Sequence, residues 1–120
     1  MPRGVLKIES TEAFDEAIGS GDVSVVLFGA PWCPACKDLK KPFLKMSKEA
    51  KGIRFLDVNV DALADVGDKW NIDSMPTVML FSNGKPLPAS HTKGKTQLVG
   101  PTPEEVRSAF EPFLPLTTDV

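Results

Sequence analysis

The sequence predicts an α/β fold in which a central mixed β-sheet is flanked by α-helices on both faces. The segment from Val23 to Phe28 is a nearly continuous β-branched and apolar run, which is typical of a central strand buried on both faces. After a first helix, the predicted elements follow in the order β, α, β, α, β, β, α, which indicates a mixed sheet between helical layers. The 120 residues are 42% hydrophobic and 25% charged, as expected for one globular domain spanning residues 1–120.

The first elements are a helix and the central strand. The helix runs from Ser10 to Ile18, with Ser10 or Thr11 as its N-cap, and Gly19-Ser20-Gly21 ends it. The strand from Val23 to Phe28 follows directly. Because both faces of a strand this apolar are expected to be buried, we expect helices on both sides of it.

A second helix begins at the cysteine motif and leads to a second core strand. Pro34 suits its first position, because the N–H that proline lacks would be unpaired there, whereas Pro42 should bend its interior. The strand is predicted by the alternation from Arg54 to Val60, with Asp57 on the same side as Phe55. The apolar face of the helix carries Leu39, Phe43, Met46 and Ala50.

The second half of the chain predicts a short helix and a hairpin. Asp61 can cap a short helix whose apolar residues are Leu63, Val66 and Trp70. The strand from Thr77 to Phe81 runs into Asn83-Gly84, the strongest short hairpin signal, and Gln97 to Val99 lies in the return strand. Because Pro86 to Lys95 is polar and contains prolines, we expect a longer, mobile loop there rather than a two-residue turn.

The last helix begins at a capping box with proline at its first position, Thr102-Pro103-Glu104-Glu105. Val106 and Phe110 then lie on one face of this helix. Pro112 and Pro115 stop it.

Charge and hydropathy favour a cytoplasmic protein that binds neither nucleic acid nor membrane. The longest strongly apolar run, Val23 to Ala30, is far shorter than the roughly 20 residues that span a bilayer, and the first residues lack a signal-peptide apolar stretch. Net charge is −2, and the basic residues are not gathered into one block. We interpret His91 as a solvated loop residue, and the cluster Lys40, Lys41, Lys45 and Lys48 as a solvated helix face.

The two cysteines, Cys33 and Cys36, point to redox chemistry. A disulfide that closes so small a loop removes little unfolded-state entropy, about 2 kcal/mol against nearly 5 for a loop of about 100 residues, so a purely structural role is unconvincing. A structural zinc ion needs four ligands, and the chain offers only one histidine besides the two thiols. No metal site is therefore expected.

Thiol–disulfide exchange needs an attacking thiolate and a second thiol that resolves the mixed disulfide. We expect Cys33 to lie exposed where a helix begins, facing the positive end of the helix dipole, which favours its thiolate. Cys36, one turn later, can attack the sulfur of Cys33. Lys37 adds positive charge nearby.

The motif Trp32-Cys33-Pro34-Ala35-Cys36-Lys37 resembles the active site of the thioredoxin family. The segments Val58-Asn59-Val60-Asp61, Met75-Pro76-Thr77, Phe81-Ser82-Asn83-Gly84 and Val99-Gly100 fall in family order, so that the resemblance covers roughly Val5 to Leu114. It implies a thioredoxin fold. It also implies a cis Met75–Pro76 bond against the cysteines, a Met75 backbone free to pair with a partner peptide, and a docking surface of Trp32, Met75, Pro76 and Gly100. Without the motif, these four residues would be ordinary half-buried, strand-entry or turn residues.

Two departures from the family bear on mechanism. The usual Gly-Pro between the cysteines is Pro34-Ala35 here, so no reduction potential can be transferred. The family's buried aspartate falls on Leu27, which cannot accept a proton from the resolving cysteine. Asp57, on the adjacent strand, is our hypothesis for a substitute base; the alternative is a solvated acid, with water deprotonating Cys36.

The resulting interpretation is a protein-disulfide reductase in which Cys33 attacks and Cys36 resolves. Its expected partners are disulfide-containing target proteins and a thioredoxin-reductase-like flavoenzyme that reduces the pair again. The chain itself needs no cofactor and is expected to be a monomer. The alternatives are a specialised redoxin or oxidant/isomerase of the same fold, which Pro34-Ala35 keeps open, and a redox-silent peptide-binding module.

Overall fold

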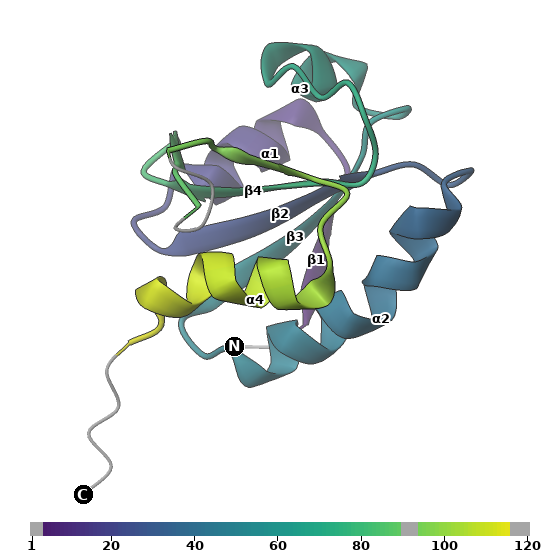
Figure 1. The fold of residues 1–120 in the computed structure, drawn as a ribbon. Helices are drawn as coiled ribbons and strands as arrows, with labels where there is room; N and C mark the ends of the chain where they lie inside the picture. Colours follow the sequence, from purple (N-terminus) through teal and green to yellow (C-terminus); the bar gives the residue numbers. More distant parts are fainter. Residues whose placement is uncertain (1–3, 90–93, 116–120) are drawn as a thin grey trace, which may run out of the picture.

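The computed structural model describes residues 4–89 and 94–115, which form a mixed sheet between two layers of helices (Figure 1). His91 lies outside the described residues. No helix within the described ranges is long and apolar enough to cross a bilayer. The elements, in chain order, are β1 (Val5–Ile8), α1 (Thr11–Ile18), β2 (Val23–Gly29), α2 (Pro34–Glu49), β3 (Ile53–Asn59), α3 (Ala64–Lys69), β4 (Thr77–Ser82), β5 (Lys85–Leu87), β6 (Gln97–Val99), α4 (Pro103–Phe110) and the 3-10 turn η1 (Glu111–Phe113).

The predicted mixed sheet is confirmed. Its strands lie in the order β1-β3-β2-β4-β5, and β6 also pairs with β4. β1, β3 and β2 are parallel, whereas β4 is antiparallel to β2 and to its two short neighbours. β2 is central and almost wholly buried, as its apolar sequence requires.

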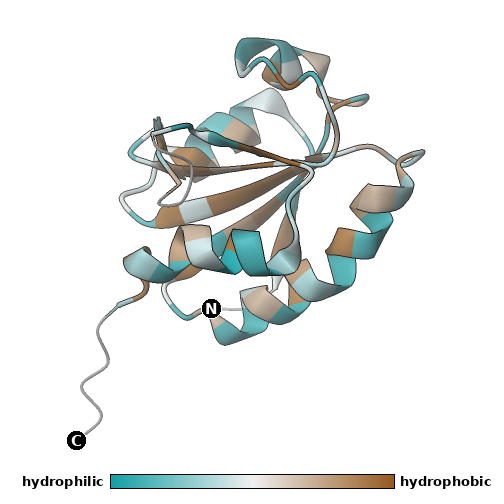
Figure 2. Cartoon of the chain, viewed as in Figure 1, coloured by the Kyte–Doolittle hydropathy of each residue, from teal (hydrophilic) through white to brown (hydrophobic). Residues whose placement is uncertain are grey.

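The central strands are strongly hydrophobic (Figure 2), and two hydrophobic clusters of buried residues cover the two faces of the sheet. Alternate residues of β2 supply them: Val25 and Leu27 pack toward α2 and α4, and Val26 and Phe28 pack toward α1 and α3. Edge-to-face ring pairs reinforce both sides, at centroid separations of 5.2 Å for Phe43–Phe55 and 5.9 Å for Phe14–Phe81.

The helix caps follow the sequence closely. The Ser10 hydroxyl accepts from the N–H of Ala13 at 3.0 Å and begins α1. The capping box of α4 is complete, with Thr102 and Glu105 each accepting the other's backbone N–H. In α2, Pro34 stands at the start and Pro42 lies inside a helix that is continuous from Pro34 to Glu49.

The expectation that no two-residue turn follows β4 is wrong, and the loop that was expected over Pro86 to Lys95 begins only after β5, with residues 90–93 outside the described part of the chain. Asn83 and Gly84 have φ of 55° and 77° and form a two-residue turn, after which Lys85–Leu87 pairs with β4 as β5. Two positive φ values are what the tight turn of a twisted hairpin requires. β6 then pairs with the first half of β4, so both short strands share one edge of that strand.

Candidate functional site

The site lies where β2 ends and β4 begins. Phe28 and Thr77 are partners in the antiparallel β2–β4 pair. The loop that follows β2 and the loop that precedes β4 therefore meet at the same edge of the sheet. The first loop carries the cysteine motif and the second carries Met75-Pro76.

Cys33 and Cys36 form a disulfide at the beginning of α2, with their Cα atoms 5.3 Å apart. Cys33 is the N-cap, and its Sγ accepts a hydrogen bond from the backbone N–H of Cys36 at 3.1 Å. An amide donor and the positive end of a helix dipole both stabilise negative charge on that sulfur when the pair is reduced. The predicted helix-start position of Cys33 is confirmed.

The disulfide is less exposed than the sequence suggested. Cys33 is 4% exposed and Cys36 is 1% exposed, because both pack into a small cluster with Ala30 and Met75. The expectation of an exposed Cys33 is therefore wrong for the oxidised form. A partner must approach Cys33 in a defined orientation, since little of the residue can be reached.

Gly29 makes room for the buried cysteine. A Cβ placed on Gly29 would lie 3.2 Å from Cys36 Sγ and 3.4 Å from Cys36 Cβ, tighter than side chains ordinarily pack. Gly29 was not among the site residues expected from the sequence. Its signal was present, since glycine at the end of a buried strand often marks a close approach.

Trp32 and Asp61 are joined beside the disulfide. The indole of Trp32, which is 62% exposed, donates from Nε1 to Asp61 Oδ2 at 2.8 Å. The predicted capping role of Asp61 is wrong, because α3 has Leu63 as its N-cap and no side-chain capping bond. The amide oxygen of Asn59 instead accepts the backbone N–H of Asp61 at 2.9 Å and holds this turn.

The Met75–Pro76 bond is cis, as the family resemblance implied. Met75 packs against the disulfide cluster, and Pro76 is buried. The carbonyl of Pro76 accepts the N–H of Gly100 at 2.8 Å, and Gly100 has a φ of 59°. Among the described residues, no hydrogen bond occupies the backbone N–H or C=O of Met75. Met75, Pro76 and Gly100 thus lie together at the edge that holds the disulfide.

The other residues of the motif are exposed on the first turn of α2. Pro34, Ala35 and Lys37 all face solvent. Lys37 supplies a positive charge one turn from Cys33.

Leu27 and Asp57 are neighbours in the parallel β2–β3 pair and face α2. Leu27 is 1% exposed and belongs to the core. The Asp57 side chain is 25% exposed, and one of its oxygens lies 3.8 Å from Lys40 Nζ. No hydrogen bond joins Asp57 to either cysteine within the described part of the chain. The structure thus places Asp57 on the cysteine side of the sheet but not against the disulfide.

Comparison with known proteins gives consistent matches. The family model described as Thioredoxin matches residues 5–100. Thioredoxin-2 of Saccharomyces cerevisiae is 31% identical over 107 residues, covering 88% of this chain and 95% of the relative. Thioredoxin of Homo sapiens is 40% identical over 83 residues, covering 68% and 79%. The crystal structure of Malassezia sympodialis thioredoxin superposes with a TM-score of 0.79 at 30% identity and covers 93% of each chain.

Proposed function

This chain belongs to the thioredoxin family and is a protein thiol–disulfide oxidoreductase, and we propose that Cys33 is its nucleophile and Cys36 its resolving thiol. The observation that carries the assignment is the position of Cys33. It caps α2, receives the N–H of Cys36 on its sulfur, and can close a disulfide with that same residue. Cys36 is almost fully buried behind it and is less accessible to a partner.

The reaction transfers two electrons to the partner. The thiolate of Cys33 attacks one sulfur of the partner's disulfide, a mixed disulfide forms, and the partner's other sulfur leaves as a thiolate that takes a proton from solvent. Cys36, once deprotonated, attacks the Cys33 sulfur and expels the second partner sulfur as a thiolate, which takes a proton from solvent. The partner ends as a dithiol, and the Cys33–Cys36 pair ends oxidised.

Docking of the partner uses Trp32, Met75, Pro76 and Gly100. Met75 packs against the weakly exposed disulfide, the N–H of Gly100 bonds to the carbonyl of Pro76, and no hydrogen bond among the described residues occupies the Met75 backbone, which supports pairing with an extended peptide. Val99, which is 61% exposed beside Gly100, adds apolar surface at the same edge. The bond from Trp32 to Asp61 holds the indole in place for such a contact.

Asp57 acts in this scheme as the base for Cys36. It is the acid that lies beside Leu27 on the α2 side of the sheet, and it is partly shielded from water. One of its oxygens lies 3.8 Å from Lys40 Nζ, which keeps the side chain on the α2 side of the sheet. Since no hydrogen bond joins Asp57 to Cys36 among the described residues, the proton passes through water in this scheme.

A disulfide reductase that ends oxidised needs an electron donor. A thioredoxin-reductase-like flavoenzyme is the partner we assign to this step, with no cofactor held by the chain itself. Cytoplasmic location fits this role, because the cytoplasm keeps thiols reduced. We assign one domain and a monomeric state to the chain.

The test is turnover of a protein disulfide with dithiothreitol as the terminal reductant. The wild-type protein should accelerate the reduction, and Cys33→Ser should abolish the acceleration. Retention of activity in Cys33→Ser would contradict the assignment, and absence of activity in the wild type would favour a redox-silent peptide-binding module. A redox titration of the pair then separates a reductase from a specialised redoxin or an oxidant/isomerase, which the Pro34-Ala35 dipeptide also allows.

A further inference from the structure

α2 carries a positive charge that the rest of the chain does not share. The helix contains five lysines and two acids, so it has a net charge of +3 in a chain of net charge −2. The lysines are all exposed, and we call them the lysine face: Lys37, Lys40, Lys41, Lys45 and Lys48. The exposed Leu44 lies among them.

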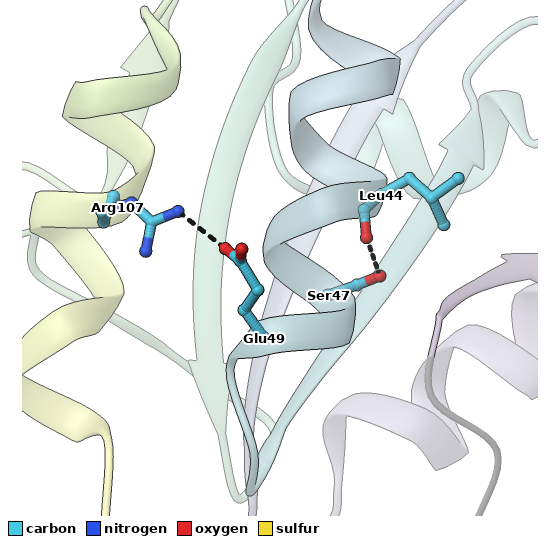
Figure 3. A network of polar contacts seen from close by, with 4 residues as sticks. All are labelled: Leu44, Ser47, Glu49 and Arg107. Atoms are coloured by element: carbon cyan, nitrogen blue, oxygen red, sulfur yellow. Dashed lines mark hydrogen bonds and ion pairs between the residues drawn. The ribbon is translucent and has the colours of Figure 1, made fainter.

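The two acids of α2 lie just outside one edge of the arc that the lysines occupy. At about 100° per residue, the five lysines and Leu44 fall within an arc of about 140°, and Asp38 and Glu49 fall beyond its edge. Glu49 points to α4, where its carboxylate accepts from Arg107 at 3.2 Å, while Leu44 points to the opposite side (Figure 3). The lysine face is therefore turned away from α4.

Within the described part of the chain, three of the five lysines form no ion pair with an acid. Lys40 Nζ lies 3.8 Å from Asp57, but the Lys40 side chain remains 57% exposed. Lys37, Lys41 and Lys45 form no ion pair with the residues that the structure describes. Glu49 does not neutralise them, because it is engaged by Arg107.

The lysine face starts within the footprint of any protein that reaches the disulfide. A standard interface covers about 800 Å² on each partner, which corresponds to a disc of about 16 Å radius. With a rise of about 1.5 Å per residue, Lys37 lies about 6 Å, Lys41 about 12 Å and Lys45 about 18 Å along the helix from Cys33. A partner docked on Cys33 thus covers the first lysines and meets Lys45 at its rim.

We propose that the lysine face selects protein disulfides flanked by acidic residues, and that it orients these partners over Cys33. The inference rests on the exchange reaction proposed above and names the class of substrate for it. Opposite charges across an interface raise the rate of productive encounter and exclude like-charged partners. Orientation matters here because Cys33 is only 4% exposed. Since the whole chain is net negative, the attraction comes from this face and not from overall charge.

Three synthetic peptides test the proposal. They share one intramolecular disulfide loop and differ only in a six-residue tail of Glu, Gln or Lys, which reaches about 20 Å when extended and so spans Cys33 to Lys45. The second-order rate constant for reduction by the pre-reduced, full-length protein is measured at low and high salt. We expect the Glu-tailed peptide to react about tenfold faster than the Lys-tailed peptide at low ionic strength, with the ratio approaching one in about 0.5 M salt.

Two double variants locate the effect on the surface. Lys41→Glu/Lys45→Glu should lower the Glu-to-Lys rate ratio about tenfold. Lys85→Glu/Lys95→Glu, which changes the net charge equally but lies on β5 and before β6, should lower it less than twofold. Equal rates for the two charged peptides with the wild type, or equal losses in the two double variants, would overturn the proposal. Failure to reduce the uncharged Gln-tailed peptide would instead refute the exchange reaction, and the docking proposal with it.

Discussion

Replacing Asp57 by Asn should slow the step in which Cys36 releases a partner from Cys33. In the β2–β3 pair, Asp57 is the register partner of Leu27. Two residues further along both strands, Asn59 is the register partner of Gly29. A strand separation of about 4.8 Å and a two-residue rise of about 6.6 Å place the Asp57 and Gly29 Cα atoms about 8 Å apart. Cys36 Sγ sits over Gly29, and no hydrogen bond joins it to Asp57 among the described residues, so we expect the carboxylate to act on it through a water.

This geometry sets the size of the effect. Direct general-base catalysis is typically worth about 10² to 10⁴ in rate, and a relay through water belongs below that range, so we expect about a tenfold slower resolution. Stability should barely change, because the Asp57–Lys40 pair joins side chains that are 25% and 57% exposed. Exposed pairs of this kind contribute less than about 1 kcal/mol to the free energy of unfolding.

The assay is stopped-flow fluorescence of a preformed mixed disulfide between Cys33 and a peptide. Asp65→Asn is the matched control, since it removes the same charge from α3 on the opposite face of the sheet. Resolution should be about tenfold slower in Asp57→Asn only. Equal resolution rates in Asp57→Asn and the wild type would refute the role of Asp57 as a base and leave water as the acceptor.

Other variants probe the frame around the disulfide. Asp61→Ala removes the hydrogen-bond acceptor of the Trp32 indole. The rate of protein-disulfide reduction should fall a few-fold, while the free energy of unfolding should change by less than about 1.5 kcal/mol. Unchanged kinetics would exclude a role for Asp61 in orienting the indole. Gly29→Ala places a methyl group 3.2 Å from Cys36 Sγ, so chemical denaturation should reveal a loss of about 1–3 kcal/mol, whereas wild-type stability would show that the site has room. Thr102→Ala removes the N-cap of α4 and should cost about 1 kcal/mol by the same measurement; an unchanged midpoint would contradict the capping account.

Elements with a strong periodic pattern were predictable, and the short edge elements were not. β2 and α2 follow from apolar runs that only a buried strand or one helix face can accommodate. β1 was not predicted, because its four residues include the adjacent exposed residues Leu6 and Lys7 and so show no alternation of apolar and polar side chains. β5 was not predicted, because Pro86 argues against a strand. Proline is nevertheless tolerated here, since β5 is an edge strand of the sheet.

Within the site, local features were predictable and long-range contacts were not. The position of Cys33 at the beginning of a helix could be predicted from Cys33 and Pro34 alone. The bond between Trp32 and Asp61 joins residues 29 positions apart, and nothing in the local sequence distinguishes such an acid from a helix cap. The low exposure of Cys33 likewise depends on Met75, which the fold brings from a distant loop.

The most direct test of the account is to trap the mixed disulfide. Reduced Cys36→Ser protein, incubated with a disulfide-containing protein, should accumulate a covalent complex that dithiothreitol reverses, and mass spectrometry should place the link at Cys33. A complex that fails to form, or one that still forms in a Cys33→Ser/Cys36→Ser double variant, would contradict a nucleophilic sulfur at the beginning of α2.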